Sequence, residues 1–239
     1  MKTAAQADGR QASPEINHPG TRNPDVADPA AGIPDTGLII DEHGKPRCFW
    51  QPSMPDYHDH EWGRPVADDR RLFEKICLEG FQAGMAWITI LRKREAFREA
   101  FDDFDMERVA RYTEHDVERL MGNAAIVRNR AKILSAINNA QRARKLAHET
   151  GSLAGWLWSH EPSPQDRPAA VDRAYWDNNP TSKASVELSR ALKRRGWTFV
   201  GPTTIHAFMQ AVGMVNEHMS GCVCHAQIEA ARASFRRPG

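Results

Sequence analysis

Cysteine and histidine residues occur near both ends of the apolar-rich part of the chain, and these are the residue types that bind metals. His218 and Cys222 are four residues apart, so a helix over 215–222 would place both side chains on one face, one turn apart. Cys48 and His58 form the pair that can supply two further ligands. Two thiolates and two imidazoles suit Zn²⁺, and four protein ligands leave no open position for water. The spacing predicts one structural zinc site that ties the start of the folded region to its end.

Other assignments of these residues stay open. Cys224 and His225 are competing ligands that spacing does not dismiss, and Cys222 can instead be a buried thiol with His218 facing solvent beside Glu217. Roughly 160 residues separate the two halves, without a finger-like repeat. Because the chain lacks the apolar core of a signal peptide, its four cysteines are better interpreted as thiols or metal ligands than as two disulfides.

A second group of side chains could hold an aromatic ligand. Glu79 lies in the otherwise apolar stretch 76–81, where burial would raise the pKa of its carboxyl group and make the charge costly without a partner. Trp87 could stack on a ligand with exocyclic N–H groups, while Glu79 and Tyr57 form hydrogen bonds with it. Trp50 completes the predicted binding set, and Glu79 is the predicted catalytic residue. The alternative is that Glu79 forms a local cap or salt bridge and Trp87 belongs to the core.

The segment from Leu120 to Lys145 carries six basic residues and no acidic one. A short connection at 123–127 separates two helical patterns, which predicts a helical hairpin. Basic side chains and backbone N–H groups at a helix start can bind phosphates. We therefore predict nucleic-acid contacts from Arg128, Arg130 and Lys132. A basic face exposed to water is the alternative.

The elements that position these residues are predicted to be helices. Asp68 and Asp69 can cap a helix that ends near Gly80 or Gly84, and a second, amphipathic helix is expected from about Gln82 to Ala100. Further start and stop signals predict helices after Thr113 with Asp116, after Ser182 or Ser185 as far as Gly196, and after Pro202. Because apolar residues alternating at period two are almost absent, the predicted fold class is all-α.

Composition separates the chain into regions. The 239 residues suit one domain, and the first 46 carry 4 basic and 7 acidic residues with no apolar period, so residues 1–46 are predicted to be a disordered extension. The folded domain is placed at 47–226, with the hairpin at about 116–148 and a C-terminal tail at 227–239. No stretch approaches the roughly 18 apolar residues of a membrane span. We expect a soluble, cytoplasmic monomer without membrane contact.

Several motifs occur in order along the chain: Tyr57-His58-Asp59-x-Glu61-Trp62-Gly63, Leu72-Phe73-Glu74, Cys77-Leu78-Glu79-Gly80-x-Gln82-Ala83-Gly84-x-x-Trp87-Ile88-Thr89, Ile126-Val127-Arg128-Asn129-Arg130-x-Lys132-Ile133, Phe199-Val200-Gly201-Pro202-Thr203-Thr204, Phe208-Met209-Gln210-Ala211 and Gly213-x-Val215-Asn216-x-His218-x-x-Gly221-Cys222. Together they resemble the 3-methyladenine DNA glycosylase I family over about Arg47 to His225. Three positions depart from the family pattern, namely Met54, Ala125 and His206.

The resemblance implies a helix-hairpin-helix glycosylase fold with a structural zinc clasp on Cys48, His58, His218 and Cys222. It also implies that Glu79 and Tyr57 contact the alkylated adenine and that Trp87 stacks on it. The implied activity is base-excision repair, in which a monofunctional glycosylase hydrolyses the N-glycosidic bond of 3-methyladenine in double-stranded, alkylated DNA.

Two other functions remain as alternatives. One is a zinc-clasped module that binds damaged DNA without cleavage, and it has less need of a buried carboxylate at Glu79. The other is a metal-dependent hydrolase, which requires an open position on the metal.

Overall fold

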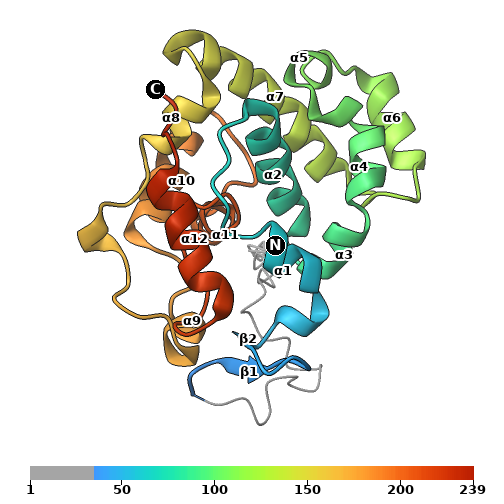
Figure 1. Ribbon diagram of the computed structural model, residues 1–239. Helices are drawn as coiled ribbons and strands as arrows, with labels where there is room; N and C mark the ends of the chain where they lie inside the picture. The colour runs from blue at the N-terminus through green and yellow to red at the C-terminus, as the bar shows by residue number, and fades with distance from the viewer. Residues whose placement is uncertain (1–34) are drawn as a thin grey trace, which may run out of the picture.

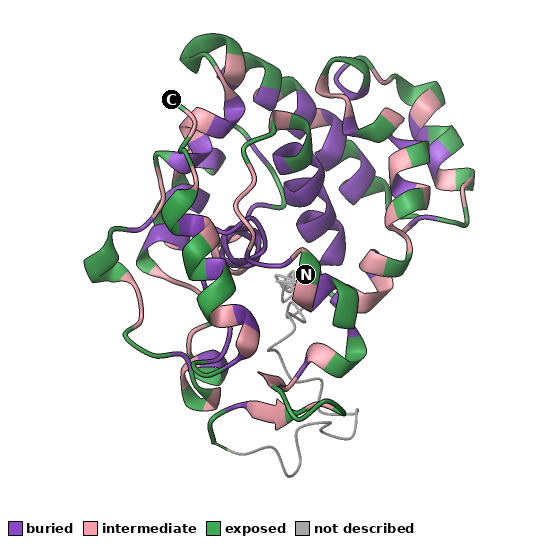
Figure 2. Ribbon diagram, in the orientation of Figure 1, coloured by how far each residue is buried: buried purple, intermediate pink, exposed green. Residues whose placement is uncertain are grey.

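Helix α2 (Asp69–Gln82) lies at the centre of the computed structural model, which describes residues 35–239 (Figure 1). The side chain of Asp68 caps it by accepting a hydrogen bond from the Arg71 backbone N–H at 2.8 Å, as predicted. Every residue from Leu72 to Gln82 is buried (Figure 2), because α2 is packed on several sides. Its neighbours include α7 (Arg130–Thr150), α8 (Leu153–Trp158) and α11 (Pro202–Ala211). Any pocket that the side chains of residues 72–82 line must therefore lie in the protein interior.

The helix predicted from Gln82 to Ala100 is two helices. A turn follows α2, with Gly84 at a φ of +78°, and α3 (Trp87–Arg92) and α4 (Arg94–Ala100) are separated at Lys93, whose φ and ψ are −97° and 1°. The apolar spacing is continuous across this bend, which explains why periodicity alone predicted one helix.

The predicted helical hairpin is present as α6 (Glu114–Gly122) and α7. Asp116 accepts a hydrogen bond from the Thr113 backbone N–H at 2.9 Å, and Asn129 caps α7 through the Lys132 N–H at 3.1 Å. Ala125 does not adopt a positive φ, so its replacement of a glycine carries no left-handed strain. The bend after Lys93 touches this hairpin, because Lys93 Nζ donates to the Ala125 carbonyl at 2.9 Å.

The C-terminal half packs on the other side of α2 (Figure 1). Helix α10 (Lys183–Arg194) starts at the predicted cap Ser182 and packs on α11. A final helix, α12 (Val223–Ser234), was not predicted, and it occupies most of the segment 227–239 that was expected to be a tail. Its buried residues Cys224, Ile228 and Arg232 recur every four positions, which is a helical pattern that the sequence analysis overlooked.

The fold is mostly helical, as predicted, and two short strands that were not predicted add to it. Strands β1 (Leu38–Ile40) and β2 (Pro46–Cys48) form an antiparallel hairpin in which Leu38 pairs with Cys48. Asp41 organises its turn by accepting hydrogen bonds from the His43 and Lys45 N–H groups at 2.9 and 2.8 Å. Residues 35–46 are therefore ordered with the domain, contrary to the predicted extension, and the rest of that extension, residues 1–34, lies outside the described residues.

Shorter elements complete the connections. They are η1 (Gln51–Ser53), α1 (Pro55–His60), η2 (Asp102–Phe104), α5 (Met106–Val109), η3 (Pro164–Asp166) and α9 (Arg173–Asn178). Within residues 35–239, no helix combines the length and apolarity that crossing a membrane requires.

Candidate functional site

A narrow pocket opens between α1, α2, α3 and α11. The four predicted binding residues line it together with Met54, Trp62, Gln82, Ala207 and Gln210. Tyr57 comes from α1, Glu79 from the last turn of α2 and Trp87 from the first turn of α3, while Trp50 precedes η1. All four are buried, with Glu79 only 4% exposed. The structure thus brings together four residues that span 38 positions in the chain.

The carboxylate of Glu79 sits in an environment that makes its charge costly. Burial raises its pKa to about 7, and the ammonium of Lys75 opposes this effect from 3.5 Å. Trp50 contributes a second unusual group, since its indole N–H is buried and has no hydrogen-bond partner among the described residues. A buried acceptor and an unpaired buried donor in one pocket indicate that a polar ligand is expected there.

Sequence analysis missed Lys75, which contacts three of the pocket residues. Its Nζ donates a hydrogen bond to Tyr57 Oη at 2.7 Å and lies 3.8 Å from the centre of the Trp87 ring. The side chain is almost fully buried, and burial lowers its pKa. The spacing to Glu79, four residues further along α2, was the available signal for an ion pair.

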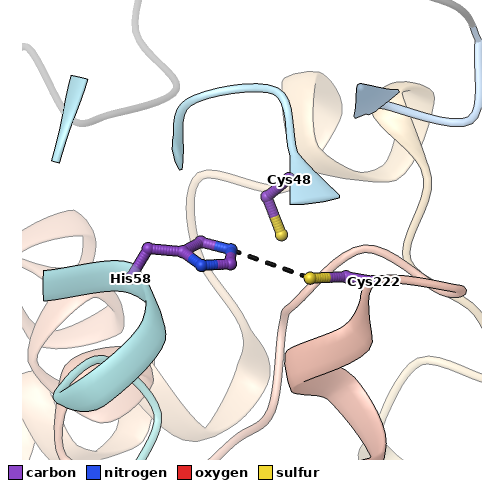
Figure 3. Close-up of side chains that lie close together, drawn as sticks. All are labelled: Cys48, His58 and Cys222. Carbon is purple, nitrogen blue, oxygen red and sulfur yellow. Dashed lines mark hydrogen bonds between the residues drawn. The ribbon is translucent and has the colours of Figure 1, made fainter. Parts of the chain in front are cut away.

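Three of the four predicted metal ligands meet beside the pocket. Cys48, His58 and Cys222 each offer a ligand atom, and these atoms all lie within 4.8 Å of one another (Figure 3). His58 Nε2 is 3.7 Å from Cys222 Sγ. Ligand atoms on a tetrahedral zinc ion are about 3.5–3.8 Å apart, given bonds of about 2.0 Å to nitrogen and 2.3 Å to sulfur. The His58–Cys222 pair therefore has the spacing that such an ion requires, and Cys48 offers a third donor of suitable chemistry within 4.8 Å of both.

The fourth predicted ligand, His218, is adjacent to this group. Its ring packs edge-on against the His58 ring with centroids 4.9 Å apart, and it forms a second cluster with His58 and Cys224. Burial lowers the pKa of His218 to about 3, so the imidazole is neutral, as a ligand must be. The predicted helix over 215–222 is absent: this segment is a loop with Gly213 and Gly221 at positive φ, so the loop rather than helical spacing brings His218 and Cys222 together.

A side-chain oxygen lies within hydrogen-bond distance of the Nδ1 atom of both His58 and His218. Asp59 Oδ1 lies 2.7 Å from His58 Nδ1 and Asn216 Oδ1 lies 3.0 Å from His218 Nδ1. The His58 ring is thus oriented with its Nε2 toward Cys222, which is the usual outer arrangement of a metal-binding histidine, whereas His218 Nε2 lies 3.5 Å from the His58 carbonyl oxygen. Cys224 approaches His58 Nδ1 at 3.8 Å and lies 3.5 Å from Arg47 Nη1, so its sulfur has these partners as well as the Cys222 thiol.

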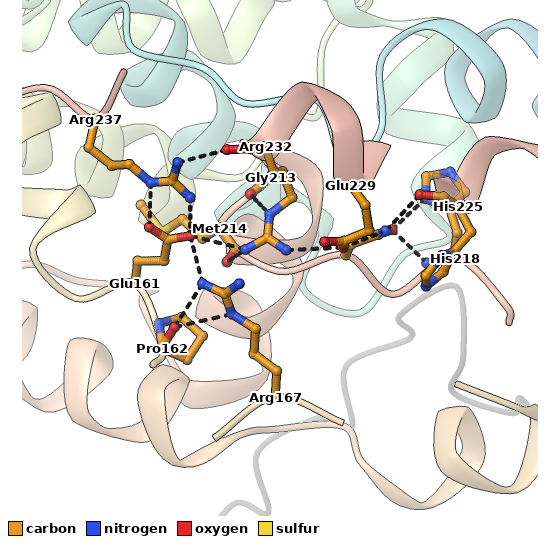
Figure 4. A network of polar contacts seen from close by, with 11 residues as sticks. Glu161, Pro162, Arg167, Gly213, Met214, His218, His225, Glu229, Arg232 and Arg237 are labelled. Atoms are coloured by element: carbon orange, nitrogen blue, oxygen red, sulfur yellow. Dashed lines mark hydrogen bonds and ion pairs between the residues drawn. The ribbon is translucent and has the colours of Figure 1, made fainter. Parts of the chain in front are cut away.

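A polar network links His218 to the C-terminus (Figure 4). Asn216 Nδ2 donates to Glu229 at 2.8 Å, Glu229 pairs with Arg232 at 3.2 Å, and Arg232 pairs with Glu161 at 3.0 Å. Arg232 also donates to the Gly213 carbonyl at 2.8 Å. Helix α12 therefore anchors the loop that carries two of the predicted ligands.

The predicted nucleic-acid contacts have different positions. Arg128 is exposed in the hairpin connection, and Arg130 is exposed but pairs with Glu114 at 2.5 Å. Lys132 is buried, and its ammonium donates to the Phe81 and Ala83 carbonyls at 2.9 and 2.5 Å. It binds the carboxyl end of α2, where carbonyl groups attract a cation, so it is not available to a phosphate. Lys132 is therefore removed from the predicted contacts.

Two bacterial proteins are similar in sequence to this chain over most of its length. The DNA-3-methyladenine glycosylase of Haemophilus influenzae is 43% identical over 184 residues, covering 74% of this chain and 97% of its own length. DNA-3-methyladenine glycosylase 1 of Escherichia coli K12 is 44% identical over 183 residues, covering 75% and 96%.

Solved structures share the fold. A crystal structure of 3-methyladenine DNA glycosylase I superposes with a TM-score of 0.68 at 45% identity, covering 75% of this chain and 99% of that one. The enzyme from Staphylococcus aureus also gives 0.68, at 36% identity and 73% and 92% coverage. A further crystal structure with the same score and identity is a complex with 3-methyladenine.

The helical fold and the relatives thus identify the chain as an enzyme of the DNA-3-methyladenine glycosylase class. The methyladenine glycosylase family model matches residues 47–225, and the chain belongs to that family.

Proposed function

We propose that this protein releases 3-methyladenine from alkylated double-stranded DNA by hydrolysing the N-glycosidic bond. The observation that carries the proposal is Glu79, a buried carboxylate in a pocket walled by Trp50, Tyr57 and Trp87. The relatives are named for 3-methyladenine, and one related structure is a complex with that base.

The pocket suits an adenine edge. In this proposal Trp87 stacks on the flipped base, Glu79 accepts a hydrogen bond from the exocyclic amino group, and Tyr57 donates to a ring nitrogen. Guanine would place its O6 acceptor against the carboxylate, which is unfavourable. The buried, unpaired N–H of Trp50 is a further donor for a bound base.

Hydrolysis of this glycosidic bond depends more on recognition of the damaged base than on acid catalysis. Methylation at adenine N3 places positive charge on the base, which makes it a good leaving group from the sugar C1′. The enzyme must still extrude the nucleotide from the duplex, at a cost of a few kcal/mol that is smaller for a damaged base. A deep aromatic pocket with directed hydrogen bonds supplies this binding energy, and water then takes the base's place at C1′.

We also propose that Cys48, His58, His218 and Cys222 hold one structural Zn²⁺. When bound, the ion supplies a cross-link between the β1–β2 hairpin, α1 and the loop before α12. Four protein ligands leave no position for substrate, so the metal holds the fold and takes no part in hydrolysis.

The exposed side of the hairpin is the proposed DNA contact. Arg128 lies in the hairpin connection and Arg130 begins α7. Lys132 joins α7 to the end of α2, and Lys93, just before α4, donates a hydrogen bond to the hairpin connection. In this proposal the two lysines hold the DNA-binding hairpin against the helices that line the pocket, and so fix the distance between the pocket and the DNA backbone.

The test is chromatography of the free bases released from methylated DNA. Wild-type protein should release 3-methyladenine selectively. Glu79→Gln should lose roughly 100-fold or more of this activity, in the range of a lost catalytic or recognition group, while binding DNA as before. Glu95→Gln, an exposed glutamate on α4 whose side chain is 75% accessible, is the matched control and should act as wild type. Folded wild-type protein that binds DNA without releasing a base would favour a lesion-binding function instead.

A further inference from the structure

The buried ammonium of Lys75 has no part in the chemistry described so far. It lies one helical turn before Glu79 and contacts Glu79, Tyr57 and Trp87, but it does not line the pocket itself. Instead it lines the adjacent cavity, with Glu61 and Arg94. Lys75 thus packs behind Glu79, Tyr57 and Trp87 and can influence a ligand in the pocket only through these three residues.

The contact with Tyr57 fixes the direction of a hydrogen bond. An ammonium has three donors and no acceptor, so Lys75 Nζ donates and Tyr57 Oη accepts across their 2.7 Å separation. The phenol has one proton of its own, and this contact leaves that proton free. Because Tyr57 faces the pocket, it is set to act as a donor to a bound base.

The contact with Glu79 controls a charge. Burial raises the pKa of Glu79, and Lys75 lowers it through both charge and hydrogen bonding. The other charged groups nearby, Glu61 and Arg94, act on Lys75. The remaining elements around the carboxylate give the pocket uncharged groups, namely Trp87 from α3 and Ala207 and Gln210 from α11. Lys75 is therefore the cation that favours the ionised form of Glu79.

We propose that Lys75 is a positioning residue that keeps Glu79 an ionised acceptor and leaves the Tyr57 hydroxyl free to donate. The inference rests on the proposed function, because it assigns these two polarities to recognition of 3-methyladenine. An adenine edge pairs an amino donor with a ring-nitrogen acceptor, which an acceptor and a donor on the protein complement. Without the cation, a protonated Glu79 would present a donor to that amino group.

The experiment compares Lys75→Met with Lys75→Arg. Methionine fills similar space without charge, and Glu79 can bind a proton once the cation is removed, so that no unpaired charge stays buried. Arginine keeps the charge, and Lys145→Met, at a lysine whose side chain is 72% exposed, is the control. The readout is the ¹³C resonance of the Glu79 carboxyl carbon against pH, assigned with Glu79→Gln. This needs neither DNA nor activity.

Lys75→Met should move the Glu79 midpoint upward by at least about one pH unit, or tenfold in proton affinity. Lys75→Arg and Lys145→Met should stay within a few tenths of wild type. An unchanged or lower midpoint in Lys75→Met overturns the proposal. If the methionine variant does not fold, Lys75→Gln gives the same comparison.

Base release separates this inference from the function on which it rests. Lys75→Met should release 3-methyladenine roughly tenfold more slowly at pH 7 and regain much of the rate at pH 8.5, whatever its melting temperature. A purely structural lysine would change the melting temperature and leave the pH profile in place. If wild type releases no 3-methyladenine while the Glu79 midpoint moves as expected, the proposed function fails and the control of Glu79 by Lys75 stands.

Discussion

Tyr57 and His58 are neighbours in α1, yet their side chains belong to two different clusters. Tyr57 Oη accepts a hydrogen bond from Lys75 at 2.7 Å in the pocket wall, whereas His58 Nε2 lies 3.7 Å from Cys222 Sγ in the metal-ligand cluster. Successive helical residues point about 100° apart, so one turn of α1 serves both. Trp50 reinforces this link, because it lines the pocket and packs on the His58 ring at 4.7 Å. Order in the metal cluster should therefore determine order in the pocket.

Removal of the proposed metal should lower fold stability and base release together. Without the ion, His58 is no longer held, and α1 carries Tyr57 away with it. We expect chelation to lower the melting temperature by roughly 10 °C or more, since 1 kcal/mol corresponds to about 2–4 °C in a domain of this size. Metal content, thermal unfolding and base release are measured on the same sample, and Zn²⁺ should restore all three. A metal-free, folded protein with full activity would contradict this coupling.

Cys222→Ala and Cys224→Ala should differ in metal content. Hydrogen bonds from Cys224 and Cys48 lower the pKa of the Cys222 thiol, which favours the thiolate that binds metal. Cys224 has Arg47 and Asp59 as neighbours, at 3.5 and 3.7 Å. We expect elemental analysis to find no bound zinc in Cys222→Ala and about one zinc per chain in Cys224→Ala. The reverse result would assign the site to the His58, His218 and Cys224 group.

Arg128→Ala should weaken DNA binding without affecting stability. Its side chain is exposed, and one lost phosphate contact should reduce the slope of log affinity against log salt by about one. Lys132→Met should instead lower stability, because two carbonyls at the end of α2 lose their buried donor. Salt titrations of duplex binding and thermal unfolding of both variants are the measurements. A reduced salt slope in a fully stable Lys132→Met would restore that residue to the DNA interface.

Local signals in the sequence predicted much of the fold. Asp68 and Ser182 cap the helices expected to follow them, and the hairpin lies where its basic helical patterns placed it. Each of these features depends on contacts within a few residues. The bend at Lys93 and the β1–β2 hairpin were missed because the bend preserves the apolar period and strands of three residues leave almost no pattern.

The candidate site was predicted by residue type and resemblance more than by geometry. The pocket gathers Tyr57, Glu79, Trp87 and Trp50. The four-residue spacing from Glu79 was the one local signal for Lys75, whose contacts with Tyr57 and Trp87 depend on packing between helices. His218 and Cys222 were paired on the assumption of a helix, whereas a loop brings them together. Proximity across long sequence separations comes from packing, which local patterns do not contain.

Stability should fall as pH rises between about 4.5 and 7 through Glu79. Burial raises its pKa from the ordinary value of 4.5 to about 7, so over this range the folded protein binds the proton more tightly than the unfolded chain. The contribution of Glu79 to the free energy of unfolding is then greatest below pH 4.5 and is lost as the pH rises toward 7, by on the order of 3 kcal/mol at most. Urea unfolding of wild type and Glu79→Gln across this range should show the fall only in wild type. Parallel curves would mean that Glu79 titrates normally.

Arg232→Ala should destabilise the protein far more than Arg237→Ala. The Arg232 side chain is 3% exposed and donates to the Gly213 and Met214 carbonyls, at 2.8 and 2.9 Å, as well as to Glu161. Its removal leaves these buried acceptors unpaired, at a cost of roughly 3–5 kcal/mol. Arg237 pairs with the same Glu161 from a side chain that is 37% exposed, so its loss should cost about 1 kcal/mol or less. Because Arg232 anchors the loop before α12, its variant should also bind zinc more weakly in a competition with a chelator. Equal losses for the two variants would show that the network in Figure 4 does not support the metal ligands.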